Sequence, residues 1–279
     1  MVSEYKSPRA KYYIYIGAVF FSFLVLLPLY ILFILSFAAP SQTITPIYPH
    51  LVPTQFTLQN FLNAFGVGGK VLEYAFFKSL ETAFVVAALA IVLGFHAAYG
   101  LNKLPFKISS IIVAVLFFST MIPSITIAIP ISETFLRIGL YDSVIGLALA
   151  QELIVLPLSV FLLMGTFETV PKQLELQARV DGASFAQALY RVLFPLVVPG
   201  MVSAFLLSWL FSWDEFTFAV ILSPVHPTLP ILIFLYASAR GNLLTATSFA
   251  LMVTFPVIVL TIILSKFIKA GYLTSGITG

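Results

Sequence analysis

The stretch that decides the fold is residues 168–200, which read ETVPKQLELQARVDGASFAQALYRVLFPLVVPG. Apolar sequence flanks it on both sides, and each flank is long enough to cross a bilayer, which takes about 20 residues. The stretch carries six charged side chains in a chain of which 9% is charged. These are Glu168, Lys172, Glu175, Arg179, Asp181 and Arg191. A polar segment of this kind between two spans is expected to lie in water and to contact a soluble partner.

The local signals in this stretch predict two short helices joined by a glycine turn. Thr169 is a candidate N-cap for the first helix, and Gly182 suits the reversal that follows it. Ser184 and Gln187 have the spacing of a capping box, which starts the second helix. Pro195 is expected to end that helix. The predicted unit is therefore a helical hairpin at the membrane surface.

Composition sets the class of protein independently of this stretch. Hydrophobic residues make up 60% of the 279 residues, and the mean hydropathy is +1.06. Soluble domains carry about 25% charged residues, far above the 9% found here. The chain is therefore predicted to be an all-α polytopic membrane protein located in the cell membrane. It has no cysteine, which excludes disulfides and thiolate metal sites.

Six apolar runs are long enough to be transmembrane helices. They cover about 13–38, 80–101, 108–131, 143–166, 196–222 and 246–268. Pro123 and Pro130 are expected to kink the third of these helices. The predicted organisation is a cytoplasmic N-terminus with the first span and an external loop (1–79), a transmembrane core (80–270) that contains the polar loop, and a cytoplasmic tail (271–279).

The distribution of basic residues predicts the orientation. If both termini are cytoplasmic, ten basic residues lie inside and four outside, in line with the positive-inside rule. The inner set is Lys6, Arg9, Lys11, Lys103, Lys107, Lys172, Arg179, Arg191, Lys266 and Lys269, and the outer set is Lys70, Lys78, Arg137 and Arg240. The basic excess is thus explained by topology, and no nucleic-acid partner is expected.

Residues 168–200 resemble the cytoplasmic EAA loop of permease subunits in binding-protein-dependent ABC importers, with the coupling loop at about 168–195. The family pattern is approximately EEAAxxDGAS followed by LPxxxPG. This chain has Asp181-Gly182-Ala183-Ser184, then Pro195, then Pro199-Gly200 at matching positions. It departs at Leu176, where the family has a second Glu, and at Gln177, where it has the first Ala.

This resemblance implies a type I ABC importer permease fold with six spans and cytoplasmic coupling helices. It also implies a second homologous permease, two ATP-binding subunits and an external solute-binding protein as partners. The chain has no Walker motif, so ATP and Mg²⁺ would bind to the partner subunits. This chain itself would then hold no cofactor or metal, and it would not be an enzyme. The implied coupling residues are Glu175, Leu176, Ala178, Arg179, Asp181, Gly182, Ala183 and Ser184, and the implied hinge residues are Pro195, Pro199 and Gly200.

Looser matches indicate the sugar-importing branch of this family. Residues 51–61, 97–107 and 121–130 resemble elements of carbohydrate permeases in the right order. Trp213-Asp214-Glu215-Phe216 resembles a Trp-Asn-Glu-Phe element of the same proteins, with Asp214 in place of Asn. Charged side chains inside a span usually face the bundle interior or water. These four residues therefore either line the translocation path or form a polar contact with the partner permease.

Three alternatives remain open on the sequence. The transported solute could be something other than a sugar, because the sugar assignment depends on the looser matches. An ion-coupled secondary transporter would need its own coupling site and internal symmetry, neither of which is evident. A membrane enzyme would need a spaced nucleophile or metal cluster, and the spans contain none in their sequence pattern.

Overall fold

The computed structural model describes residues 8–39, 55–238 and 243–275, and in these ranges every regular element is a helix. An isolated bridge joins Ala38 to Phe56. The helices are α1 (Pro8–Phe37), α2 (Gln59–Lys103), α3 (Phe106–Thr120), α4 (Ser124–Ile138), α5 (Val144–Glu168), α6 (Lys172–Val180), α7 (Phe185–Gln187), the π-helix η2 (Ala188–Leu193), α8 (Phe194–Trp213), α9 (Thr217–Leu222), α10 (Leu229–Ser238) and α11 (Leu243–Ser275).

Within the described residues, six membrane spans are present if one broken pair is counted as a single span, which agrees with the predicted number. Five helices are long and apolar enough to cross a bilayer alone. The third span is α3 and α4 together, which meet at an angle of 84°. The break falls at Pro123, because a proline disfavours helical geometry in the residue before it. Pro130, by contrast, lies inside the continuous α4, so only one of the two expected kinks becomes a break.

The predicted bounds of the second and fifth spans were wrong. Helix α2 begins at Gln59, so residues 59–79, expected to belong to an external loop, are already helical. Residues 40–54 of that loop lie outside the described residues. The fifth span does not run unbroken to residue 222, because α8 ends at Trp213 and α9 starts after a turn. Helix α10 was not predicted at all.

The chain divides into two compact units, residues 1–70 with 233–254 and residues 71–232 with 255–279. In the first unit a buried side chain joins the end of α1 to the start of α2. The amide of Asn60 donates to the carbonyl oxygens of Ser36 (3.1 Å) and Ala38 (2.9 Å). The hydroxyl of Ser248, near the start of α11, donates to the same Ser36 oxygen (3.2 Å). These contacts satisfy carbonyls that the end of α1 leaves free.

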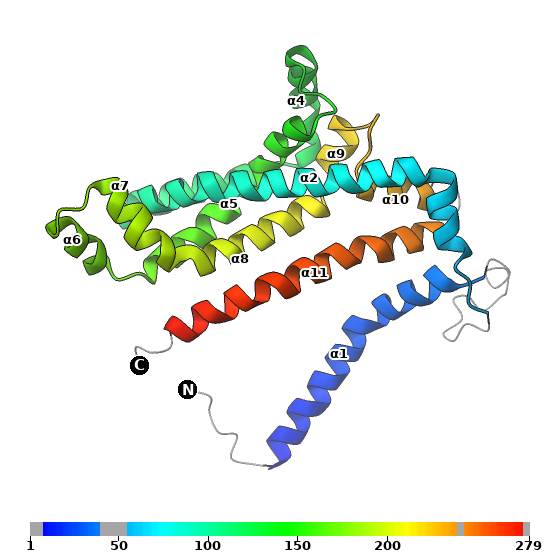
Figure 1. The fold of residues 1–279 in the computed structure, drawn as a ribbon, viewed down its shortest axis with the longest axis horizontal. Helices are drawn as coiled ribbons and strands as arrows, with labels where there is room; N and C mark the ends of the chain where they lie inside the picture. The colour runs from blue at the N-terminus through cyan, green and yellow to red at the C-terminus, as the bar shows by residue number, and fades with distance from the viewer. Residues whose placement is uncertain (1–7, 40–54, 239–242, 276–279) are drawn as a thin grey trace. The chain divides into compact units, whose positions relative to one another are not determined.

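The second unit is built on α2, α5 and α8, with α6 and α7 at one end and α4 and α9 toward the other (Figure 1). Helix α5 packs closely against α8. A Cβ placed on Gly200 of α8 would overlap the hydroxyl of Thr166 and lie 2.8 Å from its Cβ. Farther along the same pair of helices, the hydroxyls of Ser159 and Ser208 form a buried hydrogen bond of 2.8 Å. Small side chains thus let the two backbones approach, as in other membrane helix pairs.

The helix after the glycine turn does not end at Pro195, contrary to the prediction. It continues through the π-helix η2 into α8, and Pro195 lies in the first turn of α8. At this point the backbone N–H of Phe194 bonds to the carbonyl of Leu189, five residues back. Proline cannot donate to the helix and its ring clashes with the carbonyl four residues earlier. The wider π turn accommodates the proline without breaking the helix.

Candidate functional site

The turn between α6 and α7 has the geometry that the sequence predicts. Helix α6 ends in a Schellman motif, in which Ala183 N–H bonds to the Ala178 carbonyl (2.9 Å) and Gly182 N–H to the Arg179 carbonyl (3.1 Å). Gly182 has φ +91°, a left-handed conformation that favours glycine. The motif leaves the α6 end with its carbonyls satisfied and fixes the direction in which the chain returns.

The capping box on the second arm is also confirmed. Gln187 N–H donates to the Ser184 hydroxyl (3.3 Å), and Ser184 N–H donates to the Gln187 side-chain oxygen (2.8 Å). The predicted N-cap of the first arm was wrong. Pro171 occupies the N-cap of α6, whereas Thr169 is the C-cap of α5 and its hydroxyl donates to Thr166. Pro171 has no side-chain acceptor, so α6 begins without a side-chain cap.

Glu175 ties α6 to the end of α2 and does not face solvent. Its side chain accepts hydrogen bonds from the Tyr99 hydroxyl (2.8 Å) and from the Lys103 ammonium, and the residue is buried. Burial would raise the pKa of the Glu175 carboxyl, but the hydrogen bonds from Lys103 and Tyr99 outweigh it and hold that pKa below its usual value. Glu175 is therefore a charged brace within this chain at neutral pH.

The root of the hairpin is built into the hydrophobic core. Leu189 and Leu193 are buried in a cluster with Phe95 of α2 and Phe167 of α5. The ring of Phe185 packs on Tyr99 with centroids 5.5 Å apart. Because the hairpin shares one core with three spanning helices, a displacement of α6 and α7 is expected to move the ends of those helices with it.

The exposed side of α6 presents two large apolar side chains to solvent. Leu176 is 64% exposed and Val180 is 88% exposed, and their spacing of four places them on one face of the helix. Arg179 and Asp181 are exposed beside them. We call Leu176, Arg179, Val180 and Asp181 the coupling face. Val180 was not among the predicted coupling residues, although its spacing from Leu176 was a usable signal.

The predicted hinge residues lie inside helix α8. Pro195 follows the π-helix and Pro199 is within α8. Gly200 is the point of close approach to Thr166. The structure therefore places all three where the hairpin arm becomes a spanning helix.

The four residues of the predicted translocation path have different environments. Trp213 is buried and stacks on Trp209 at 4.8 Å. The Glu215 carboxylate accepts hydrogen bonds from the backbone N–H groups of Phe218 (2.7 Å) and Ala219 (3.1 Å), which caps α9. Phe216 packs against the core formed by α4, α5 and α9. Asp214 is exposed at the end of α8.

A second polar cluster, which the sequence did not reveal, lies around Lys78 near the middle of α2. The Lys78 ammonium is buried and donates to Asp142 Oδ1 (2.9 Å), to the Asp142 carbonyl (3.2 Å) and to the His226 carbonyl (2.8 Å). His226 Nδ1 lies 2.5 Å from Asp142 Oδ2. Burial would raise the pKa of Asp142, but the hydrogen bonds from Lys78 and His226 outweigh it and lower that pKa. The cluster joins α2 to the α4–α5 turn and the α9–α10 loop.

Comparison with known proteins agrees with this architecture. Residues 90–272, which include the hairpin, match a family described as binding-protein-dependent transport system inner membrane component. The chain belongs to this family. Its members are components of transport systems.

Two relatives of this permease align along most of its length. The trehalose transport system permease protein SugB of Mycobacterium tuberculosis is 31% identical, and the alignment covers 90% of this chain and 91% of the relative. The sulfoquinovosyl glycerol transport system permease protein SmoH of Agrobacterium fabrum is also 31% identical, over 85% of this chain and 83% of the relative.

A solved structure shares the fold of this permease. It is a chain from a bacterial ABC transporter involved in the import of the acidic polysaccharide alginate, with a TM-score of 0.73 and 18% identity. The match covers 95% of this chain and 99% of that chain. The all-α, six-span fold of an importer permease is thereby confirmed.

Proposed function

We propose that this permease is the membrane-spanning subunit of an ATP-driven, binding-protein-dependent importer for a sugar or oligosaccharide. The family match and the relatives named for trehalose and sulfoquinovosyl glycerol support this function. Partner subunits bind and hydrolyse ATP with Mg²⁺. A second homologous permease completes the path across the membrane, and an external solute-binding protein delivers the sugar.

The coupling face of α6 is the site to which an ATPase subunit binds in this proposal. The observation that carries it is an apolar pair, Leu176 and Val180, held in water on a hairpin whose root is buried. Exposed apolar side chains with polar neighbours are typical of a docking surface. Glu175, Ala178, Gly182, Ala183 and Ser184 then shape and brace the hairpin, and a shift of α6 is passed to α2, α5 and α8 as a rigid-body motion.

The positions of the remaining predicted residues suit the same mechanism. Pro195, Pro199 and Gly200 lie at the root of the moving arm. Among residues 213–216, Asp214 is exposed at the end of α8 and can face a translocation path. Trp213, Glu215 and Phe216 instead hold the end of α8 against its neighbours.

The orientation in this proposal places both termini and the hairpin in the cytoplasm. Because the natural chain has no cysteine, single-cysteine variants report sidedness directly. Arg179→Cys should react with a membrane-impermeant maleimide only after the cells are opened, whereas Lys70→Cys should react in intact cells. Labelling of Arg179→Cys from outside would contradict the assignment.

Transport itself is tested by reconstitution. The chain is placed in proteoliposomes with its partner subunits, and uptake of radiolabelled sugars is measured with ATP or a non-hydrolysable analogue inside. Uptake should require hydrolysable ATP and should persist when ionophores collapse ion gradients. Uptake that follows an ion gradient and ignores ATP would identify a secondary transporter instead.

A further inference from the structure

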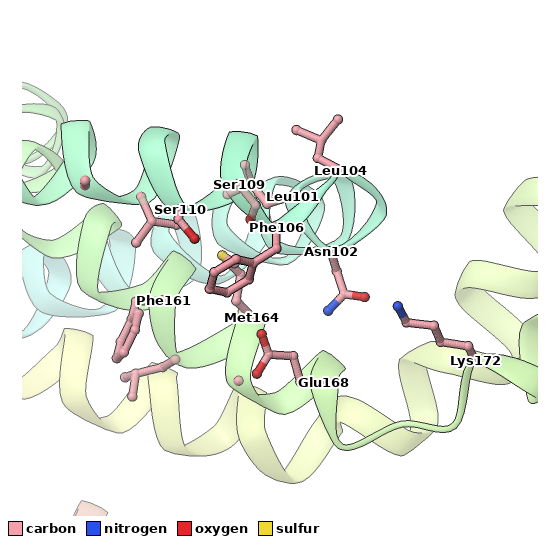
Figure 2. Close-up of a pocket in the computed structure, with 14 residues that line it drawn as sticks. Leu101, Asn102, Leu104, Phe106, Ser109, Ser110, Phe161, Met164, Glu168 and Lys172 are labelled. Carbon is pink, nitrogen blue, oxygen red and sulfur yellow. The ribbon is translucent and has the colours of Figure 1, made fainter.

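A large pocket lies between the end of α2, the start of α3, the end of α5 and the first residue of α6 (Figure 2). Its volume is about 800 Å³, within the range of small-molecule sites, which is roughly 300–1,000 Å³. Val113 of α3 and Phe161 and Met164 of α5 line its apolar part. Asn102, Glu168 and Lys172 line the other part. The pocket is thus amphipathic, with an apolar half and a charged half.

The charged half carries side chains that lack partners. Among the described residues, neither Glu168 nor Lys172 forms an ion pair or a hydrogen bond. Figure 2 shows the side chains of Asn102 and Lys172 directed toward each other, with the Glu168 carboxylate on the other side of the pocket, directed toward Phe106 and Met164. Unpaired charges of both signs around one opening would complement a ligand that itself carries both signs.

A buried hydroxyl at the pocket wall is a second, independent sign of a ligand. Ser109 of α3 is 6% exposed, lines the pocket, and its Oγ has no hydrogen-bond partner among the described residues. Most buried hydroxyls in proteins have a partner. Helix α3 also lacks a side-chain N-cap, because Pro105 occupies that position. An acceptor such as a phosphate oxygen would satisfy these donors.

The position of the pocket relative to the spans decides what kind of molecule fits. It lies where α2 ends at Lys103 and α5 ends at Glu168, which are also the ends of two apolar spans. Its apolar part continues along α3 and α5 toward the bilayer core, and its charged part opens at the interface. A phospholipid has this polarity and this orientation, whereas a soluble metabolite has no reason to enter from the bilayer side.

We propose that this pocket binds a phospholipid with a primary-amine headgroup, such as phosphatidylethanolamine, from the leaflet on the α6 side. The phosphate lies toward Lys172 and Ser109, the ammonium lies toward Glu168, and one acyl chain packs on Val113 and Phe161. Glu168 selects against a purely anionic headgroup by repulsion. It favours a primary amine over a choline, which cannot donate a hydrogen bond. The bound lipid abuts the link between α5 and the coupling hairpin.

The test uses the purified full chain in nanodiscs and a phosphatidylethanolamine with a diazirine on its acyl chain. After irradiation, peptide mass spectrometry should find the label on α3 and α5 near Val113 and Phe161. Unlabelled phosphatidylethanolamine should compete at least five-fold better than phosphatidylglycerol or phosphatidylcholine. Equal competition by all three lipids would overturn the proposal, because the charged half of the pocket would then select nothing.

Three variants test the charged half and the apolar half of the pocket independently. Glu168→Gln should abolish the preference over phosphatidylglycerol without reducing total labelling, and Lys172→Gln should weaken labelling by every phospholipid. Ala114→Trp should fill the apolar part and reduce labelling at least five-fold. Lys107→Gln, a charge change at the same membrane boundary outside the pocket, should change nothing. If Ala114→Trp leaves the labelling unaltered, the site is refuted. A cross-link from Phe161 to the sister permease in the assembled complex would also refute it.

Discussion

Lys78 and Lys103 lie on the same helix, α2, about 37 Å apart by helix rise, and each forms an ion pair with an acid from another segment. Lys78 pairs with Asp142 of the α4–α5 turn, and Lys103 pairs with Glu175 of the coupling hairpin. This separation exceeds the hydrocarbon thickness of a bilayer, about 30 Å. Helix α2 is therefore fastened to the α6–α7 hairpin at its C-terminal end and to the α4–α5 turn near its middle.

Of these two pairs, Lys78–Asp142 should contribute more to stability, because it is buried. Lys78 and Asp142 have side chains 3% and 13% exposed. Lys78→Met removes one buried donor from the Asp142 carboxylate, which keeps those from Ser223 and His226, and it also removes the donor to the Asp142 carbonyl, a loss of about 3–5 kcal/mol. The midpoint of thermal unfolding in detergent should fall markedly. The double variant Lys78→Met/Asp142→Asn should recover part of the loss, since Asn tolerates the left-handed backbone at residue 142 (φ 57°).

A matched control for this prediction is the pair Glu133–Arg137, which is exposed on α4. Arg137→Met should change stability by less than about 1 kcal/mol, as is usual for surface ion pairs. Equal effects of Lys78→Met and Arg137→Met would show that burial of the Lys78 cluster contributes nothing.

The brace at Glu175 should weaken in acid. Its pKa is lowered in the folded chain from an ordinary value of 4.5, so its stabilising contribution is present above pH 4.5 and is lost as the pH falls through the lower folded value. Hydrogen exchange of α6 amides, corrected for intrinsic rates, should therefore accelerate below pH 4.5. Glu175→Gln should show faster exchange already at pH 7 and little further change in acid, whereas Glu133→Gln should behave as the natural chain.

Variants at Gly182 can show whether this position needs glycine for its backbone angle or for lack of space. A Cβ at this position would meet no atom within 4 Å, so only the backbone angle, φ +91°, restricts the side chain. Gly182→Asn should retain most uptake, because Asn enters the left-handed region readily, whereas Gly182→Val should cost at least 1–2 kcal/mol locally and displace α7. Uptake in proteoliposomes measures both. Similar activity of the two variants would mean that the turn geometry does not matter for coupling.

The coupling face allows a test in which stability and function diverge. Val180 is 88% exposed, so Val180→Asp should leave the unfolding midpoint unchanged within error. If an ATPase subunit covers this face, the same change places an unpaired charge in an apolar contact and should reduce co-purification of that subunit at least tenfold. Gln173→Asp, a comparable change elsewhere on α6, serves as the control. Normal co-purification of Val180→Asp would remove the coupling face from the proposed interface.

Local signals predicted the turn and the capping box, but they failed where a nearby proline altered a helix end or where the partners lie far apart in sequence. The Gly182 turn and the Ser184–Gln187 box were predictable because their partners lie within a few residues. Pro195 was misjudged because the π-helix η2, which directly precedes α8, accommodates the proline without a break. The Lys78–Asp142–His226 cluster was invisible in the sequence, because its members are 64 and 84 residues apart and no spacing rule joins them.

The close approach of α5 and α8 gives the last prediction. A methyl group at Gly200 would overlap the Thr166 hydroxyl and also approach the Thr166 Cβ to 2.8 Å. Gly200→Ala should therefore destabilise the pair by about 1–3 kcal/mol, the usual effect of overpacking. Thr166→Ala should rescue it only partly, because the Cβ remains, while Thr166→Gly should rescue it most. A double-mutant cycle on thermal unfolding measures the coupling energy. Strictly additive effects of the two sites would show that residues 166 and 200 are not in contact, and the hinge role of Gly200 would then have no packing basis.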